Sequence, residues 1–374
     1  MSARPIKILF VVPNLAAGGA ERHVSTLLPR LDPTRFVPSV VCLGWDGELF
    51  ADVRDSGIEA RALWLTKRQA ARALRELVSI MRSDLPDVVV VMGRNAEIIG
   101  RIAARVAGVA RTIVWVHQAT EILPRGTGHR MIDRALRRWT NRYFGVAEAQ
   151  RRFLADERGY PVEKIRIIRN GVDPTLFDVT TCRDSLGEFG VTEGDPVVGI
   201  IGMLRWEKDH ETFLRAARIV LDQLPRAKFL VVGDGPCRSG LEALCSDLDL
   251  SGSVCFTGIR GDIDRILCAV DVFAMTSTTE CFPMALLEAM ACARPVVCTA
   301  VGGIVEIVND GETGYLVSPR SPEQVAARMV QLLSDPEAAR RMGLAGRRRV
   351  EAEFGLDRSV EAAQRAIEDL ITVR

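Results

Sequence analysis

Two glutamates with a proline between them are the residues best placed to do chemistry. Glu280 and Glu288 lie in Ser277–Val297, which reads STTECFPMALLEAMACARPVV, with seven residues between the two carboxylates. Pro283 suits the first position of a helix because it has no N–H group to leave unpaired and its φ is already helical. The residues that follow, Met284–Ala291, are strong helix formers. The spacing therefore predicts Glu280 in a loop and Glu288 near the second turn of a helix.

The start of this predicted helix is a candidate anion site. The backbone N–H groups of Met284, Ala285 and Leu286 would point out of its first turn without helical partners, and such helix starts bind phosphates. Glu280 could hold sugar hydroxyl groups and Glu288 could accept hydrogen bonds from a ribose diol, because an ionised carboxylate accepts hydrogen bonds. A diphosphate with a sugar at one end and a ribose at the other fits this arrangement.

Two cations and a histidine are placed where α/β proteins bind ligands. Arg205 and Lys208 lie in the loop after the predicted strand Val197–Ile201. Cations there can neutralise a diphosphate and stabilise the charge that builds on it as a glycosidic bond breaks. His117 follows the predicted strand Thr112–Val116, at the edge where doubly wound sheets bind ligands. From position alone, each of these three residues could take part in chemistry or have a structural or surface role.

Two glycines mark a second candidate phosphate site near the N-terminus. Gly18 and Gly19 follow the predicted strand Ile6–Val12 and open a predicted helix, which is the geometry by which doubly wound folds approach phosphates. The fingerprint G-x-G-x-x-G is absent there, which argues against a nicotinamide or flavin enzyme. His23, on this helix, and His210, in the second half of the chain, are expected to be surface or packing residues.

Strands alternate with helices through both halves of the chain, which predicts parallel sheets covered on both faces. The segment Asp178–Pro196 lacks a clear strand, so we expect Rossmann-like domains at 1–178 and 179–355, followed by a terminal helix in 356–374. The expected strands are Ile6–Val12, Val37–Leu43, Ile58–Leu65, Val88–Met92, Thr112–Val116, Val197–Ile201, Lys228–Val232, Val254–Gly258, Asp271–Met275 and Pro295–Thr299.

Composition excludes several classes of protein. The 374 residues are enough for two domains, and a formal net charge of +1 gives no global attraction to nucleic acid. The nine cysteines are scattered singly, which is typical of reduced, buried thiols in a cytosolic enzyme. No apolar run approaches the roughly 18 residues that span a bilayer. We therefore expect a soluble or peripheral protein.

One stretch, Arg125–Arg152, is strongly basic, with eight arginines against Asp133 and Glu148. Apolar residues interleave with the arginines at helical spacing, which predicts an amphipathic helix. Its basic face could simply be solvated, or it could meet anionic lipid head groups or the phosphate of a substrate. The interleaved apolar residues are Ile132, Leu136, Trp139 and Tyr143.

The Glu280–Glu288 stretch resembles the glutamate–seven–glutamate signature of the retaining glycosyltransferases of family 4, which have the two-domain GT-B fold. Three positions depart from the family pattern: Cys281 and Ala293 stand where glycine is usual, and Met203 where arginine is usual. Cys281 would change the shape of the sugar pocket, and Arg205 would supply the missing guanidinium. Further runs that resemble the family are GGAE from Gly18, FGVAE from Phe144, IRIIRNGVDPTLF from Ile165 and GDGP from Gly233.

The resemblance implies two doubly wound Rossmann-like domains facing across a cleft, with the acceptor bound by the N-terminal domain and the nucleotide sugar by the C-terminal one. It implies that Gly18 and Gly19 lie beside the donor diphosphate and that His117 faces the sugar and the acceptor. The catalytic residues that it implies are His117, Glu280, Arg205 and Lys208. It also implies that the terminal helix crosses back to the N-terminal domain. The remaining implied donor-binding residues are Ile259, Arg260, Phe282, Pro283, Met284, Ala285, Leu286 and Glu288.

No metal or other cofactor is implied. Asp262 and Asp264 form a D-x-D pair, as do Asp247 and Asp249, and such pairs hold a divalent metal in another glycosyltransferase class. We interpret Asp262 as the N-cap of a helix instead.

The function implied is retaining, metal-independent transfer of a hexosyl-type group from a UDP- or GDP-sugar. The acceptor would be a glycan, a lipid-linked or a small molecule in bacterial polysaccharide or glycoconjugate biosynthesis. The alternatives are a nucleotide-sugar epimerase of the same architecture and a non-catalytic nucleotide-sugar-binding protein. A cytoplasmic location is expected, peripheral on the inner face of the membrane if the basic stretch binds lipid.

Overall fold

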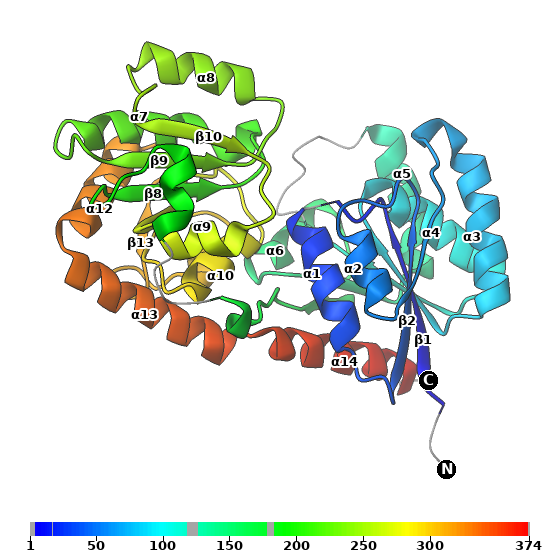
Figure 1. Ribbon diagram of the computed structural model, residues 1–374. Coiled ribbons are helices and arrows are strands. Elements are labelled where there is room, and N and C mark those ends of the chain that lie inside the picture. Colours follow the sequence, from blue (N-terminus) through cyan, green and yellow to red (C-terminus); the bar gives the residue numbers. More distant parts are fainter. Residues whose placement is uncertain (1–3, 17, 118–125, 178–182, 373–374) are drawn as a thin grey trace. The chain divides into compact units, whose positions relative to one another are not determined.

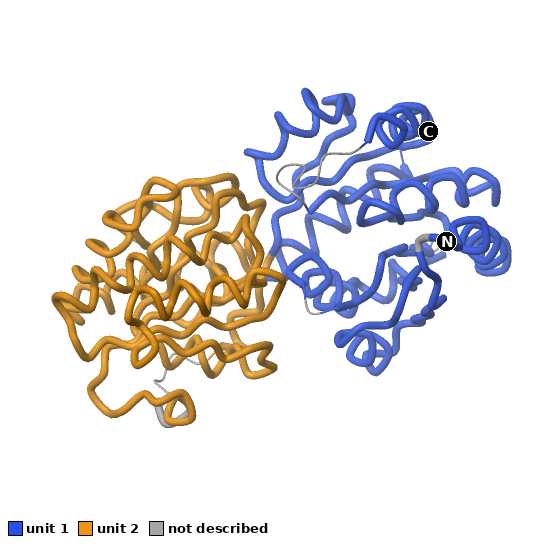
Figure 2. The backbone as a smooth tube through the Cα atoms, turned by 90° about the horizontal axis from the view of Figure 1, so that it is seen from above, with its two compact units in different colours: residues 1–170, 356–374 blue, residues 171–355 orange. Residues whose placement is uncertain are grey.

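The chain divides into two compact units. Unit 1 comprises residues 1–170 and 356–374, and unit 2 comprises residues 171–355 (Figure 2). The computed structural model describes residues 4–16, 18–117, 126–177 and 183–372. The boundary expected at Asp178 lies outside the described residues, while the two units divide after Asn170.

Unit 1 is built on a seven-stranded sheet in which every neighbouring pair is parallel, in the order β3-β2-β1-β4-β5-β6-β7. The order reverses between β1 and β4, which is the switch point where open α/β sheets bind ligands beyond the carboxyl ends of their strands. The strands are β1 Ile6–Val12, β2 Phe36–Cys42, β3 Glu59–Ala62, β4 Val88–Met92, β5 Arg111–Trp115, β6 Arg142–Gly145 and β7 Ile165–Ile167.

Helices cover this sheet, and the last helix of the chain is one of them (Figure 1). Helix α14 is tied to unit 1 by polar contacts: the Gln364 side chain accepts from Asp32 N at 2.7 Å, and Arg35 Nε donates to Glu368 at 2.9 Å. The helices of unit 1 are α1 Gly19–Leu27, α2 Phe50–Asp55, α3 Ala70–Asp84, α4 Arg94–Ala107, α5 Thr127–Leu136, α6 Ala149–Arg152 and α14 Leu356–Thr372.

Unit 2 repeats the design with six parallel strands in the order β10-β9-β8-β11-β12-β13. The central strands are buried on both faces, as continuous apolar runs predict for a parallel sheet. The strands are β8 Val197–Ile201, β9 Lys228–Val232, β10 Val254–Gly258, β11 Val272–Met275, β12 Val296–Thr299 and β13 Tyr315–Val317. The helices are α7 His210–Leu221, α8 Arg238–Asp247, α9 Ile263–Ala269, α10 Met284–Ala291, α11 Ile304–Ile307, α12 Pro322–Ser334 and α13 Pro336–Glu353.

The predicted fold class is confirmed: two parallel, Rossmann-like sheets form the two-domain α/β GT-B architecture. The expected strands Ile6–Val12, Val88–Met92, Val197–Ile201, Lys228–Val232 and Val254–Gly258 have the observed bounds. The helices in the described parts of the chain include none that is long and apolar enough to cross a membrane.

The prediction of one amphipathic helix through the basic stretch was wrong. Helix α5 ends at Leu136, a short 3-10 turn follows, and Tyr143 is buried in strand β6. The apolar spacing is shared by a helix and the strand after it, so it imitates a single helical period. The arginines also do not share one face. Arg137 is partly buried and its guanidinium donates a hydrogen bond to Arg158 O, whereas Arg134 is exposed.

Candidate functional site

A buried ion pair forms the centre of the site in unit 2. Lys208 Nζ lies 2.6 Å from Glu280 Oε1, and Ser277 Oγ donates to the same oxygen at 2.7 Å. The Glu280 side chain is 8% exposed and that of Lys208 is 27% exposed, so a ligand could still reach the ammonium. The structure thus brings together two predicted catalytic residues and adds Ser277, which the sequence did not single out.

Sheet topology explains how residues so far apart in the chain meet. Strands β8 and β11 are parallel neighbours, so the loops after them leave the same edge of the sheet. Thr278 N donates to Glu207 O at 2.8 Å, and Thr276 Oγ1 donates to Asp209 O at 2.9 Å. These bonds hold the loop that carries Glu280 against the turn that carries Lys208.

The helix predicted after Pro283 is α10. It begins at Met284 with Pro283 as its N-cap, one residue later than expected, and Leu287 N is the first donor back to Pro283 O, at 3.4 Å. The N–H groups of its first turn are therefore oriented outward from the helix start, as an anion site requires. Glu288 is 5% exposed and lies on this helix near the second turn, as predicted.

The residues around the start of α10 are closely packed. Phe282 is buried and packs edge-on against Phe354, with ring centroids 5.5 Å apart. Gly302 has φ of +50°, and a Cβ there would lie 1.8 Å from the carbonyl oxygen of Glu280. Only glycine fits at this position, so the Gly302 turn fixes the backbone of the loop that carries Glu280.

The GDGP turn plays a related part after strand β9. A Cβ on Gly233 would lie 2.1 Å from Gly202 O, and one on Gly235 would lie 2.5 Å from Leu204 O. These glycines let the loop after β8 pack closely. That loop leads directly into Arg205 and Lys208.

The side chains of three further residues predicted for this site, Arg205, Ile259 and Arg260, form no hydrogen bond or ion pair with Lys208 or Glu280 in the described part of the chain. The side chain of Arg205 is 49% exposed, and its guanidinium lies 3.9 Å from the Glu207 carboxylate. Ile259 is 74% exposed after strand β10. Arg260 pairs with Glu188 and with Asp262 at 2.9 and 2.8 Å, which raises its pKa and commits its side chain within unit 2.

Asp262 occupies the N-cap position of α9, as interpreted from the sequence. Within the described part of the chain, however, its side chain makes no capping bond and pairs with Arg260 instead. That pairing lowers the pKa of Asp262. Across the described ranges, no group of three His, Cys, Asp or Glu side chains is arranged to hold a metal ion.

Cys281, the unusual neighbour of Glu280, is a buried neutral thiol. Burial raises its pKa, and the carboxylates of Glu280 and Glu306 raise it further. Because the thiolate is the reactive form, the protonated thiol of Cys281 is unreactive, and its effect on the site comes from its size.

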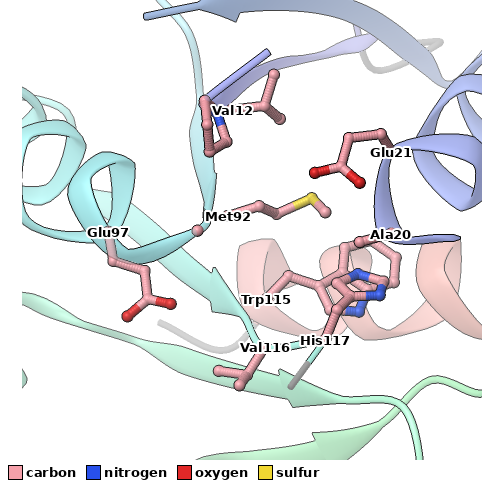
Figure 3. Close-up of a pocket in the computed structure, with 10 residues that line it drawn as sticks. Val12, Ala20, Glu21, Met92, Glu97, Trp115, Val116 and His117 are labelled. Atoms are coloured by element: carbon pink, nitrogen blue, oxygen red, sulfur yellow. The ribbon is translucent and has the colours of Figure 1, made fainter. Parts of the chain in front are cut away.

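Unit 1 carries a second candidate site at the switch point of its sheet. A cavity of about 90 Å³ lies beyond the ends of β1, β4 and β5, beside the start of α1 (Figure 3). Gly18 is the N-cap of α1 and Gly19 its first residue. The lining residues are Val12, Pro13, Ala20, Glu21, Met92, Gly93, Glu97, Trp115, Val116 and His117.

His117 lies at the end of β5, as predicted, and its ring stacks on Trp115 with centroids 5.6 Å apart. His23 of α1 packs against both rings, at 5.5 Å from Trp115 and 5.7 Å from His117. Burial, with a smaller contribution from His23, lowers the pKa of His117 well below its usual value. Burial also lowers the pKa of His23 to about 4. Both imidazoles are therefore neutral at pH 7, and His23 is a packing residue.

Two carboxylates flank Met92 in the view of Figure 3, Glu21 on α1 and Glu97 on α4. Glu97 is buried and accepts a hydrogen bond from Arg158 Nη2 at 3.1 Å. A Cβ on Gly18 would lie 2.3 Å from Glu21 Oε2, so the carboxylate rests against the glycine turn. Sequence reasoning missed these two glutamates and Trp115; the GGAE run and the position of Trp115 at a strand end were the available signals.

Comparison with known proteins adds two family matches. The family model described as Glycosyl transferases group 1 matches residues 184–349, and the one described as Glycosyltransferase Family 4 matches residues 17–176. The matched segments lie largely in unit 2 and unit 1, respectively.

Curated relatives include a protein named a glucosyltransferase and one named a synthase. The 2-deoxystreptamine glucosyltransferase of Streptomyces kanamyceticus is 30% identical over 308 residues, which cover 78% of this chain and 80% of that protein. The N-acetyl-alpha-D-glucosaminyl L-malate synthase of Bacillus anthracis is 30% identical over 211 residues, which cover 56% of this chain and 55% of that protein. The chain thus spans only about half the length of some relatives that it matches.

Solved structures share the fold. The Anabaena protein Alr3699/HepE in complex with UDP-glucose superposes with a TM-score of 0.85 at 22% identity, over 98% of this chain and 100% of that chain. Sucrose-phosphate synthase from Thermosynechococcus elongatus superposes with a TM-score of 0.81 at 20% identity, over 99% and 100%. At such identities these likenesses show the architecture alone.

Proposed function

The chain belongs to the family 4 glycosyltransferases, the group 1 glycosyl transferases of GT-B fold, and from that membership we propose a specific reaction. It transfers a hexosyl-type group from a UDP- or GDP-sugar to a glycan, a lipid-linked or a small-molecule acceptor, with retention at the anomeric carbon. The observation that carries the proposal is the Lys208–Glu280 pair next to the start of α10, at one sheet edge of unit 2.

The pair suits a reaction in which a diphosphate leaves. Negative charge builds on the diphosphate as its bond to the sugar breaks, and a fixed ammonium and oriented N–H groups stabilise that charge. Lys208 supplies the ammonium and the first turn of α10 supplies the N–H groups. The side chain of Arg205 is half exposed on the same loop, and its guanidinium lies 3.9 Å from the Glu207 carboxylate, so it could turn to the diphosphate.

Glu280 and Glu288 would hold the two ends of the donor. Glu280 keeps accepting capacity for sugar hydroxyl groups beyond its bonds to Lys208 and Ser277, because a carboxylate has about four lone-pair sites. Glu288 would accept from the ribose. With these cations and N–H groups, the proposed reaction needs no metal or other cofactor.

Donor class is supported by what related proteins are named for. Alr3699/HepE has been crystallised with UDP-glucose, and the Streptomyces relative is named a glucosyltransferase. These names favour a UDP-hexose over a GDP-hexose. Unit 1 would then bind the acceptor at His117 and the start of α1, for use in polysaccharide or glycoconjugate synthesis.

A peripheral position at the membrane is part of the proposal for lipid-linked acceptors. Helix α5 exposes Met131 and Ile132, at 68% and 45%, together with Arg134. An apolar and basic surface of this kind suits anionic lipid head groups. Co-sedimentation with vesicles of phosphatidylcholine and phosphatidylglycerol tests it: Arg134→Glu with Met131→Ser should reduce binding. Equal recovery of both proteins in the supernatant would remove the membrane from the proposal.

The donor site is tested by thermal stabilisation with a panel of UDP- and GDP-sugars, with and without EDTA. A ligand that binds the native state raises the melting temperature with the logarithm of its concentration. We expect a shift with one UDP-hexose that survives EDTA and is lost in Lys208→Ala. Lys228→Ala is the matched control, because Lys228 begins β9 at the opposite edge of the same sheet and binds only Gly252 O, at 2.8 Å, among the described residues.

Two results would change the proposal. A shift that disappears with EDTA would mean that a metal takes part in donor binding. Consumption of the donor to an isomeric nucleotide sugar, without transfer to any acceptor, would identify an epimerase instead.

A further inference from the structure

A second cavity in unit 1 lies at the edge of the sheet opposite to the switch point. It has a volume of about 420 Å³ and is lined by residues at the amino ends of β5 and β6, which are parallel neighbours. The switch-point cavity with His117 lies at the carboxyl ends of the strands instead. Pockets that bind small molecules usually measure about 300–1,000 Å³. The second cavity is therefore large enough for a small ligand and is separate from the residues of the proposed reaction.

Two arginines converge on a tryptophan in the wall of this cavity. Trp139 ends the 3-10 turn after α5, and the guanidinium of Arg138 lies 4.8 Å from the centre of its indole ring. The guanidinium of Arg105, in the last turn of α4, lies 5.9 Å from the same ring centre. Both distances are within the range of about 6 Å in which a cation is attracted to an aromatic face. The ring therefore holds two long basic side chains beside one cavity.

The charges of these two arginines are not neutralised by the protein. Across the ranges that the structure describes, neither guanidinium forms a hydrogen bond or an ion pair, and both residues are exposed. Other arginines of unit 1 do have acidic partners: Arg151 donates to Glu148 at 2.9 Å, and Arg158 donates to Glu97 at 3.1 Å. The described residues that line the cavity include no carboxylate. Two like charges beside one ring repel each other, so a bound anion would stabilise this arrangement.

Asn141 adds a neutral donor to the same cavity. Its Oδ1 accepts from Thr112 N at 2.9 Å, and its own backbone N–H donates to Thr112 O at 2.9 Å. These two bonds fix the orientation of the amide. The Nδ2 group, which can donate two hydrogen bonds, has no partner among the described residues. The cavity thus combines two cations with an oriented N–H donor.

This set of donors suits a phosphate group. One guanidinium can donate to two oxygens of an anion at once, which uses both oxygens of a carboxylate. A phosphate group has three accepting oxygens, so a second guanidinium and an amide can bind it as well. We propose that the cavity lined by Arg105, Arg138, Trp139 and Asn141 binds the phosphate group of a ligand, either a small soluble molecule or a lipid head group. This site is distinct from the donor diphosphate site of unit 2.

Nuclear magnetic resonance of ¹⁵N-labelled indoles reports on the two anion sites separately. Trp139 lines this cavity, and Trp206 lies two residues before Lys208; a Trp→Phe variant at each position identifies its resonance. Inorganic phosphate, titrated at constant ionic strength, should shift the Trp139 resonance in the wild type and equally in Lys208→Ala. Any shift of Trp206 that depends on Lys208 belongs to the donor site. In Arg105→Ala with Arg138→Ala, the Kd from the Trp139 shift should rise about tenfold for each arginine removed.

Arg72→Ala with Arg75→Ala is the charge-matched control. Both arginines are exposed on α3 of the same unit, and neither lines the cavity. This control should keep the Kd of the wild type, because it removes two positive charges without touching the site. A Trp139 resonance that does not respond to phosphate would overturn the proposal, and so would a response that survives in Arg105→Ala with Arg138→Ala. The two arginines would then serve only as counter-charges to the carboxyl ends of their helices.

Vesicles of phosphatidylcholine with and without phosphatidylglycerol separate the two sources of the phosphate group. For a lipid head group, Arg105→Ala with Arg138→Ala should co-sediment less with the anionic vesicles than Arg72→Ala with Arg75→Ala. For a soluble ligand, the two double variants should co-sediment equally, while only the first loses the phosphate response of Trp139. The inference does not rest on the proposed function: a failure of that function would appear as no stabilisation by any nucleotide sugar and would leave the Trp139 response in place.

Discussion

The carboxyl edges of the two sheets carry side chains of different charge. In unit 2 the edge carries a lysine and a glutamate 2.6 Å apart, with a helix start beside them. In unit 1 the equivalent edge carries two imidazoles that burial keeps neutral, together with the carboxylates of Glu21 and Glu97. The same architecture therefore places a lysine–glutamate ion pair at one edge and neutral imidazoles at the other. Chemistry is set by the side chains at the strand ends and not by the sheet.

The buried carboxylate of Glu97 at the unit 1 edge is paired with Arg158, which can be removed. Arg158→Met would leave the buried carboxylate of Glu97 without its cation, and breaking such a pair costs about 3–5 kcal/mol of the free energy of unfolding. Urea unfolding followed by tryptophan fluorescence would report on it, since Trp45, Trp64, Trp115 and Trp139 all lie in unit 1. Arg134→Met, on the exposed face of α5, should leave the midpoint unchanged. An equal midpoint in both variants would show that Glu97 is protonated or solvated.

The charged edge of unit 2 is broken by Lys208→Ala. Removing a preorganised cation from a developing charge costs about 2.7–4 kcal/mol, so kcat should fall a hundred- to thousandfold. Steady-state assays with the donor found by thermal shift would measure it, with Lys228→Ala as the control. A fall in kcat of less than about fivefold would transfer the role to Arg205, and the double variant would then show the full loss.

The neutral imidazoles predict how stability responds to acid. The pKa of His23 is about 4 in the folded chain, and an unfolded histidine has a pKa near 6.5. Between these pH values the unfolded state binds more protons than the folded state. The contribution of His23 to the free energy of unfolding is therefore fully present above pH 6.5 and is lost as the pH drops toward 4. The shift corresponds to a loss of about 3 kcal/mol.

His23→Phe should remove that part of the acid sensitivity, and urea midpoints from pH 4 to 8 would show it. His210→Phe is the comparison in unit 2, because burial also lowers the pKa of His210 to about 4, with a smaller contribution from Lys208. An unchanged pH dependence in His23→Phe would mean that the pKa of His23 is the same in the folded and unfolded chains, which would contradict its lowering by burial.

The sequence predicts the unit 2 edge better than the unit 1 edge, because more of the unit 2 edge comes from one contiguous stretch. Glu280 and the start of α10 are contiguous, so one stretch predicts the loop, the helix and the carboxylate. Pairing with Lys208 depends on β8 and β11 being neighbours, which strand order decides and local pattern does not. The family resemblance supplied that link.

The unit 1 edge is assembled from segments that share no motif. Trp115 reads as the buried end of a strand, and nothing in the sequence tells that its Nε1 has no protein partner among the described residues. Glu97 reads as a surface position on a helix, because its partner Arg158 lies sixty-one residues later. The helix prediction for the basic stretch was wrong because a local pattern was present but misleading: the helical spacing of its apolar residues continues by chance into strand β6.

The smallest expected effect concerns the glycine at the start of α1. In Gly18→Ala the new Cβ would lie 2.3 Å from Glu21 Oε2, while the φ of −102° is open to alanine. The backbone can therefore stay in place, and the flexible carboxylate must move. Because Glu21 lines the switch-point cavity where the acceptor is proposed to bind, KM for the acceptor should rise a few-fold, by about 0.5–1 kcal/mol in binding.

Gly126→Ala separates this effect from a simple loss of helix capping. Gly126 is the N-cap of α5, and a Cβ there would meet nothing within 4 Å. Both variants replace an N-cap glycine with a poorer cap, so both should lower the melting temperature slightly. Only Gly18→Ala should change KM, because only Gly18 supports a carboxylate at the switch-point cavity. If the two variants behave alike, Glu21 takes no part in acceptor binding.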